Sequence, residues 1–373
     1  MDLELTADQQ LFRDTTRQFL SNEVPLTTVR EWAALPAGYE PAWWQRGAEL
    51  GWTSLLVGEA DGGGSISEHG LQDLAIVAEE MGALVSPGPL GPVNIVAEAV
   101  AREGSPDQVK RVLPGLLDGE EVAAWCISER GTATGREGIT LSAESHADGF
   151  VLNGTKVPVE AGAEADWLLV TAASPMGPTQ FILPASTPGI TVTRLTGLDL
   201  VRRYAKIEFT NVALSRSALL GNEGGARSSI ERQLRTALIL QCAETVGATE
   251  RVFEFTVQYA FDRYSFGRSL ASYQALKHRF ADMKLWLESA LAITVDAAKA
   301  DDDDGEMAAI AKAYVTDRCP EIIQDCIQMH GGIGVTWDHD LHLYLRRTTT
   351  HRQTYGQPAE HRDRVAELIG SSK

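Results

Sequence analysis

The spacing of apolar residues changes character twice along the chain. From residue 6 to about 118, apolar side chains recur at the period of a helix with one buried face. Thr6 or Asp8 can cap the first helix. Two further helices are predicted over Pro41 to Leu56 and Ser67 to Met81. The first part of the chain is therefore expected to be helical.

A second pattern begins near Glu121, where short apolar runs alternate with turn-forming residues. These runs predict strands over Val122 to Ser128, Gly149 to Leu152, Trp167 to Thr171, Gln180 to Leu183, Ile190 to Arg194 and Lys206 to Phe209. Asn153-Gly154 predicts a hairpin turn. Because no long helical pattern interrupts these strands, we expect a small antiparallel barrel or sandwich.

After Gly221 the helical period returns. It predicts long helices over Ser229 to Arg263, Ala275 to Ala300, Glu306 to Met329 and Leu341 to His351. Asp301 to Asp304 form a block of like charge, which indicates a solvated connection and not a calcium loop. The chain is expected to end in a polar segment, Glu360 to Lys373.

These patterns indicate an α+β protein of three domains. We predict an N-terminal helical domain over residues 1–118, a middle antiparallel β-barrel over 119–220 and a C-terminal four-helix bundle over 221–373. The glycines of residues 62–64 predict a turn before the helix that begins at Ser67, because no Lys-Ser/Thr follows them as a nucleotide-binding loop requires.

The charge and cysteine content narrow the possible partners. A formal charge of −18 argues against nucleic acid, whose phosphates need a basic surface. The acidic N-terminus has no signal-peptide core and no later segment reaches the length of a membrane span, so a soluble cytoplasmic protein is expected. The four cysteines lack metal-ligand spacing, which indicates a reduced protein without zinc.

One polar stretch between two predicted helices offers groups that could hold a nucleotide. It runs Arg263-Tyr-Ser-Phe-Gly-Arg-Ser-Leu-Ala-Ser-Tyr-Gln274. Arg263 supplies a fixed cation, Phe266 a stacking ring and Gln274 a bidentate amide. Gly267 permits a sharp turn. By its chemistry alone, the stretch fits either a nucleotide site or an ordinary polar connection between helices.

The spacing Arg-x-x-Phe-Gly-x-x-Leu-x-x-Tyr-Gln resembles the flavin-binding signature of the acyl-CoA dehydrogenase family. Trp125-Cys-Ile-Ser-Glu129 is similar to the family's β-domain segment next to the flavin ring, and Asn153-Gly-Thr-Lys156 is similar to its hairpin. Gln328-Met-His-Gly-Gly-Ile-Gly334, followed by Trp337 to Tyr344, resembles the segment whose glycines let backbone amides approach the flavin's phosphates. The helical, β, helical order is also that of the family.

The resemblance implies a site for FAD and an acyl-CoA thioester as substrate. In the family a carboxylate base removes the α-proton of the thioester, and hydride passes from the β-carbon to flavin N5. The cofactor contacts implied for this chain are Arg263, Phe266, Gln274, Gln328, Gly331, Gly332, Cys126 and Ser128.

The chain departs from the family at both positions that carry the base. Tyr355 stands at the C-terminal position, and Ala237 stands at the alternative position on the long helix. Glu244 follows Ala237 by seven residues, on nearly the same helix face but about 10 Å farther along the axis. Glu244 is therefore a candidate base in an unusual place.

The positions that cover the flavin ring are also altered. Pro158 and Glu160 stand where the family usually has an aromatic residue and a Ser or Thr near flavin N5. A carboxylate at that point would oppose the negative charge that flavin reduction creates. Arg130 replaces a proline common in the family.

The retained residues are those that, in the family, largely serve the flavin of a neighbouring subunit. We therefore expect a partner subunit of a heteromeric acyl-CoA dehydrogenase, similar to the two-gene actinobacterial heterotetramers that act on CoA thioesters of steroids. One alternative is a self-sufficient homotetramer with Glu244, Glu160 or Asp338 as an atypical base. Another is a flavin-free scaffold or binding subunit.

Overall fold

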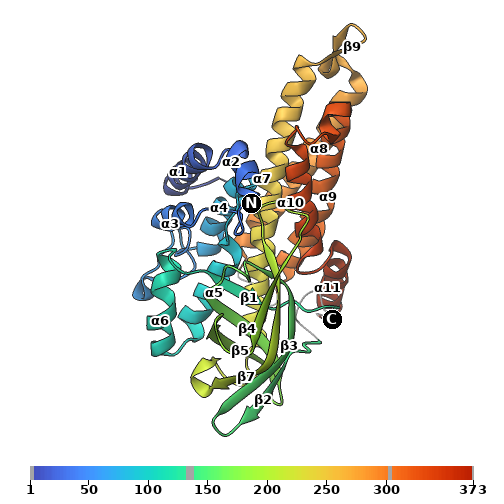
Figure 1. Ribbon diagram of the computed structural model, residues 1–373. Coiled ribbons are helices and arrows are strands. Elements are labelled where there is room, and N and C mark those ends of the chain that lie inside the picture. Colours follow the sequence, from blue (N-terminus) through green and yellow to red (C-terminus); the bar gives the residue numbers. More distant parts are fainter. Residues whose placement is uncertain (1–3, 132–137, 301–304, 372–373) are drawn as a thin grey trace.

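The computed structural model describes residues 4–131, 138–300 and 305–371. Its N-terminal part is helical, as the apolar period predicts, and ends before the first strand (Figure 1). The helices are α1 (Ala7–Glu23), α2 (Leu26–Trp32), α3 (Pro41–Glu49), η1 (Glu59–Asp61), α4 (Gly70–Ala83), α5 (Leu90–Glu103) and α6 (Pro106–Leu117). Thr6 caps α1 by accepting a hydrogen bond from the backbone of Gln9.

The middle of the chain forms the expected β domain. Its elements are β1 (Ala123–Cys126), β2 (Ser142–His146), β3 (Gly149–Glu160), β4 (Trp167–Ser174), β5 (Gly177–Pro184), β6 (Ile190–Leu195), β7 (Tyr204–Ser215), η2 (Arg216–Ala218) and β8 (Leu219–Leu220). The strands pair in the order β6-β7-β3-β2-β4-β5-β8. Most neighbours are antiparallel, but β1 and β2 both pair with β4 in parallel, which the pattern does not predict.

The predicted hairpin turn at Asn153-Gly154 is wrong, because both residues lie inside the long strand β3. The pairing of β3 with β7 shifts register there, between Leu152 and Gly154. An added Cβ on Gly154 would lie 2.8 Å from Cα of Leu141, so the glycine permits a close approach of backbone. The connection between β2 and β3 instead follows His146, which pairs with Gly149.

The C-terminal part is helical, as predicted, and carries a small hairpin at its far end. Its elements are α7 (Arg227–Asp262), β9 (Tyr264–Ser265), β10 (Arg268–Ser269), η3 (Leu270–Ser272), α8 (Gln274–Lys299), α9 (Glu306–His330), η4 (Gly331–Val335), α10 (Leu341–Gln353) and α11 (Pro358–Ser371). The final polar segment forms helix α11, which the pattern does not predict. The predicted acidic connection at residues 301–304 lies outside the described residues. No helix in the described ranges could cross a membrane.

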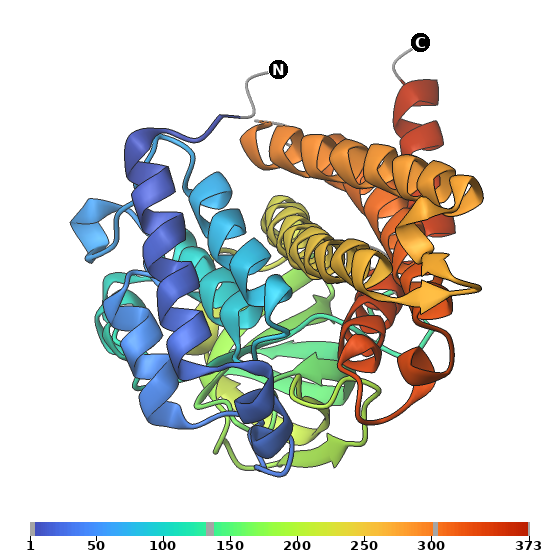
Figure 2. The same cartoon turned by 90° about the horizontal axis from the view of Figure 1, so that it is seen from above.

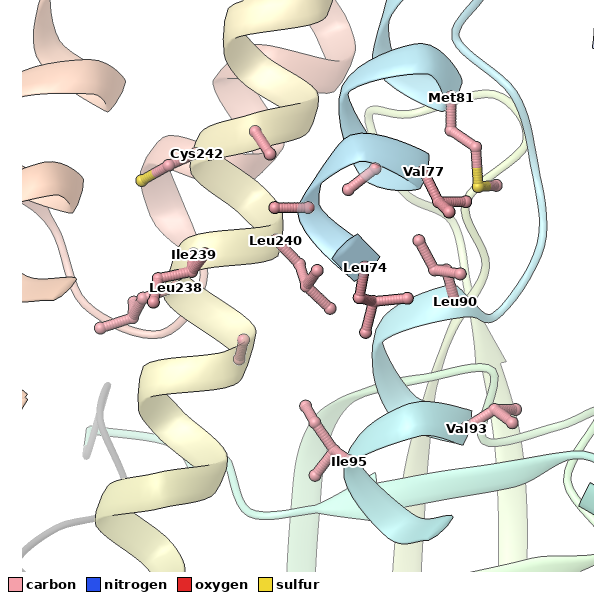
Figure 3. Close-up of a cluster of buried hydrophobic side chains, with 14 of the residues drawn as sticks. Leu74, Val77, Met81, Leu90, Val93, Ile95, Leu238, Ile239, Leu240 and Cys242 are labelled. Atoms are coloured by element: carbon pink, nitrogen blue, oxygen red, sulfur yellow. The ribbon is translucent and has the colours of Figure 1, made fainter. Parts of the chain in front are cut away.

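Helix α7 is the central element of the molecule. Seen from above, it runs between the N-terminal helices on one side and α8 and α9 on the other, over the β domain (Figure 2). Every residue from Thr236 to Thr249 is buried. Figure 3 shows Leu240 of α7 pointing toward Leu74 of α4, whereas Cys242 points the opposite way. A helix that is buried all round in its middle is held by neighbours on every side.

Two glycines bring α4 and α7 into close contact. A Cβ added to Gly82 would lie 2.1 Å from the carbonyl oxygen of Glu244, and one added to Gly247 would lie 2.0 Å from that of Glu79. These are backbone atoms of the facing helix, so a side chain at either position would force the helices apart. The crossing fixes α7 against the N-terminal domain.

We expect Gly247→Ala to destabilise the protein by about 1–3 kcal/mol through overpacking, despite the better helix propensity of alanine. The free energy of unfolding in urea measures this change. Gly91→Ala is the matched control, because nothing lies within 4 Å of a Cβ added to Gly91 in α5. An equal loss of stability in both variants would contradict the role of the crossing.

Candidate functional site

The predicted nucleotide-binding stretch forms the tip of a projection. α7 and α8 extend beyond the rest of the molecule and are joined by the β9–β10 hairpin (Figure 1). Phe266 and Gly267 have φ angles of +50° and +81°, and Arg268 pairs with Ser265 across them. Two central residues with positive φ are typical of a two-residue hairpin turn. This turn presents Phe266 to solvent, where it is 98% exposed.

The predicted phosphate-side residues are open to a ligand. Arg263, Gln274 and Gln328 are exposed, and their side chains make no hydrogen bond or ion pair within the described part of the chain. A Cβ added to Gly331 or Gly332 would meet nothing within 4 Å. A free guanidinium, two free amides and an accessible glycine backbone suit the diphosphate end of FAD. This side of the site fits the cofactor that the resemblance implies.

A ring contact connects the glycine segment to α7. His330, the last residue of α9, stacks on Tyr259 of α7 with 4.2 Å between ring centroids. Its Nδ1 lies 2.8 Å from the carbonyl oxygen of Cys326. His330 therefore holds η4, which carries Gly331 and Gly332, near the outer end of α7, one turn before Arg263.

The residues predicted to lie next to the flavin ring, Cys126 and Ser128, are far from the tip. Cys126 ends β1 and is fully buried, and burial raises the pKa of its thiol to about 12. Ser128 is also buried, and its carbonyl oxygen accepts a hydrogen bond from Val157. The neighbouring Trp125 indole donates to Gln233, near the start of α7. Arg263 follows the other end of that helix, so about 45 Å along the helix axis separates Arg263 from Gln233.

The two altered base positions come together in one small cavity. Ala237, Tyr355 and Glu160 all line it, together with Arg202 and Glu244. Its volume is about 20 Å³, room for one water molecule and not for an acyl chain. The two predicted base positions therefore face a space too small for a substrate.

Ion pairs occupy the space around this cavity. Arg202 donates from Nη1 to Glu160 Oε1 at 2.7 Å and from Nη2 to Glu244 Oε1 at 2.5 Å. His351 Nε2 lies 3.0 Å from Glu244 Oε2, and Arg347 Nη1 lies 3.6 Å from the same oxygen. All five residues are buried. We call this group the Arg202 cluster.

The sequence reasoning missed Arg202, Arg347 and His351. Arg347 also forms an ion pair with Asp199 and donates to the carbonyl oxygen of Ser86 at 3.1 Å. One signal in the sequence could have found Arg347: Arg346 and Arg347 lie next to each other in a predicted helix that also carries apolar residues. A charged residue that faces a core needs a partner. The sequence does not show which acid is that partner.

The Arg202 cluster sets the protonation of Glu244. Burial alone would raise the pKa of this carboxyl, but Arg202, His351 and Arg347 together hold it well below its ordinary value. Burial raises the pKa of Glu160, although Arg202 opposes the shift. A general base needs a pKa near the working pH and a free lone pair. The geometry of Glu244 therefore opposes its predicted role as the base.

The side that would hold the flavin ring does not fit that role. Glu160, at the predicted N5 position, is engaged by Arg202. Tyr355 packs on Trp125 with 5.4 Å between ring centroids, and burial raises the pKa of its phenol. No described residue in the cavity offers an unpaired carboxylate.

We expect Glu244→Gln to lower the free energy of unfolding by about 3–5 kcal/mol at neutral pH, because it leaves buried arginines without their anion. Unfolded Glu244 titrates near 4.5, above its folded pKa, so its contribution is present above that pH and is lost as pH falls. The variant should therefore lose less stability than the native chain below pH 4.5. Thermal melts across acid pH measure this, with the exposed Glu254→Gln on the same helix as control.

Comparison with known proteins agrees with this architecture. Residues 6–120 match the N-terminal domain of acyl-CoA dehydrogenases, and residues 223–370 match their C-terminal domain. Two relatives named Acyl-CoA dehydrogenase IpdE2 are similar over most of their length. The one from Mycolicibacterium smegmatis is 27% identical over 356 residues, covering 95% of this chain and 97% of its own. The one from Mycobacterium tuberculosis is 28% identical over 353 residues, covering 95% and 94%.

A solved structure gives the same assignment. The Tcur3481-Tcur3483 steroid ACAD aligns over 98% of both chains, with a TM-score of 0.87 and 27% identity. The similarity covers the helical, β and helical parts together. The chain therefore belongs to the acyl-CoA dehydrogenase family, whose members use FAD as their cofactor.

Proposed function

We propose that this chain is one subunit of a heteromeric acyl-CoA dehydrogenase and completes an FAD site whose catalytic base belongs to a partner subunit. The observation that carries the proposal is the closed cavity at Ala237, Tyr355 and Glu160. Both base positions of the family open into it, and the Arg202 cluster fills the space that an acyl chain would need. A chain closed at this point needs another polypeptide to remove the proton.

The open tip supports the same proposal. Phe266 is almost fully exposed, and Arg263 and Gln274 have no partner among the described residues. A large exposed aromatic side chain next to unpaired polar groups is typical of a surface that another molecule covers. The tip lies at the far end of α7 from the closed cavity, so it can serve a second chain while the cavity stays closed.

In the proposed site each residue of this chain has a defined task. Arg263 would neutralise the cofactor's diphosphate, and Gln274 and Gln328 would orient the nucleotide by their amides. Gly331 and Gly332 would let backbone N–H groups approach the phosphates. Bound FAD supplies the hydride acceptor of the family's desaturation reaction. The partner supplies the carboxylate that takes the α-proton.

The proposed substrate class is a bulky acyl-CoA thioester, with a steroid-derived acyl group as the first choice. The Tcur3481-Tcur3483 structure, which is 27% identical, is described as a steroid ACAD and names two components. Its description supports both the substrate class and the two-chain assembly. The acyl group itself would lie in the partner, because the cavity of this chain is too small.

Two alternatives make different demands on the same residues. A self-sufficient homotetramer needs an atypical base, but Glu244 and Glu160 are both bound by Arg202. Asp338 is exposed and does not line the cavity. A flavin-free scaffold would have no use for the unpaired Arg263 at the tip. The flavin-completing subunit accounts both for the closed cavity beside the middle of α7 and for the open tip at its outer end.

The visible spectrum tests the proposal directly. We expect the chain expressed alone to be colourless, and to yield a yellow complex when co-expressed with an acyl-CoA dehydrogenase chain encoded beside its gene. The complex should reduce an artificial electron acceptor in the presence of an acyl-CoA. A yellow, active protein from this chain alone would support the homotetramer, and a colourless complex would support the scaffold.

Phe266→Ala tests the tip separately from the fold. Because Phe266 contacts almost nothing in its own chain, its removal should leave the melting temperature of the isolated chain unchanged. In the complex it should weaken FAD retention by about tenfold, as expected for loss of an aromatic side chain at an interface. The exposed Met176→Ala in the β domain is the matched control. FAD fluorescence after gel filtration measures retention.

A further inference from the structure

We infer that Arg268, held on the ring of Tyr273, is a second cation for the diphosphate of the flavin nucleotide, in addition to Arg263. The inference rests on the proposed function, because it concerns the same FAD site. It adds a residue that the family-like spacing of the stretch does not include.

The side chain of Arg268 is fixed by an aromatic contact. Its guanidinium carbon lies 3.8 Å from the centroid of the Tyr273 ring. Tyr273 is in turn fixed, because its hydroxyl donates to the carbonyl oxygen of Ser265 at 2.7 Å. Arg268 also pairs with Ser265 through the backbone of the hairpin. An exposed arginine is usually mobile, whereas this one is already ordered for a ligand.

No acid neutralises Arg268. It is exposed, and within the ranges that the structure describes its guanidinium forms no ion pair or hydrogen bond. From Arg263 to Ala281 the sequence holds four cationic side chains, Arg263, Arg268, Lys277 and Arg279, and no carboxylate, and one aspartate borders the stretch at each end. Of these, Arg279 is paired with Asp325. The tip is therefore a local basic region on a chain whose net charge is −18.

The hairpin places Arg268 near Arg263. The backbone N–H of Leu270 donates to the carbonyl oxygen of Arg263 at 2.9 Å, so the strand that contains Arg268 runs beside Arg263, the residue that follows α7. A diphosphate carries charge on two adjacent phosphates and suits two guanidinium groups better than one. Stacking on Tyr273 leaves the edge of the Arg268 guanidinium free to donate hydrogen bonds.

The same guanidinium could instead bind a carboxylate of the partner subunit. The phosphate of FAD and a carboxylate of the partner are both anions, but they can be distinguished by measurement. A phosphate contact changes the affinity for FAD and for ADP, whereas a carboxylate contact changes the association of the subunits without nucleotide.

The experiment compares variants of the co-expressed complex. Arg268→Ala should raise the dissociation constant for FAD about tenfold at low salt, a typical loss for one charge-assisted contact. The loss should shrink at high salt, because the contact is electrostatic. Arg268→Lys keeps the charge but lacks the planar fork, so its loss should be smaller. Tyr273→Leu should cause part of the loss by freeing Arg268.

Arg227→Ala is the matched control, since Arg227 is an exposed arginine at the opposite end of α7. Fluorescence of released FAD, competition by ADP and sedimentation of the nucleotide-free subunits provide the readouts. Weaker FAD and ADP binding in Arg268→Ala, with unchanged subunit association, supports the inference.

Two results would overturn it. In the first, Arg263→Ala weakens FAD binding while Arg268→Ala behaves like Arg227→Ala, so the proposed function stands and this inference fails. In the second, Arg268→Ala weakens only subunit association, so its ligand is a carboxylate. If neither Arg263→Ala nor Arg268→Ala affects FAD binding, the proposed site itself fails.

Discussion

The centre of this molecule depends on one interaction: the guanidinium of Arg202 bridges the carboxylates of Glu160 and Glu244. Arg202 comes from the connection between β6 and β7, Glu160 from the end of β3, and Glu244 from the middle of α7. One buried guanidinium thus joins the β domain to the central helix. Buried charges are tolerated only when each has its partner, so replacing one of these residues would leave the others as unpaired buried charges.

The same constraint decides the chemistry that the centre can perform. A carboxylate that neutralises a buried arginine is unavailable as a proton acceptor, because protonation would leave the arginine unpaired. Arg347 and His351 extend this group from α10, and Tyr355 closes it from the following turn. A centre that is rigid and charge-balanced in this way is suited to holding three parts of a fold together. The proposed function accordingly places the thioester in the partner subunit.

The two ends of α7 differ for a physical reason. Its middle is buried on all sides, and Gly82 and Gly247 let α4 pack against it at backbone contact. Its outer end extends beyond α4 and leads into the small hairpin and α8 (Figure 1). Residues at the tip are therefore free from the packing demands of the core, and their chemistry can be set by a ligand. The basic tip on an acidic chain would attract an anionic nucleotide to that end.

Much of the fold could be predicted from the sequence, because the apolar period is a local property. The period located α7, α8 and α9 and separated the β domain from the helices. It failed at Asn153-Gly154, where pairing with β7 and the approach of Leu141 override the local turn preference. It also gave no helix over α11, which packs against α9.

The candidate site also has a part that the sequence predicts and a part that it does not. The sequence by itself placed Ala237 and Tyr355 where the family resemblance predicts a base, and it put Arg263, Phe266 and Gln274 at a fixed spacing. Only the tertiary structure decided that Glu244 is neutralised by Arg202, because the two residues are far apart in the chain and no local pattern records their contact. The identity of a side chain is fixed by its codon, whereas its charge state and its access to a ligand depend on neighbours that folding brings beside it.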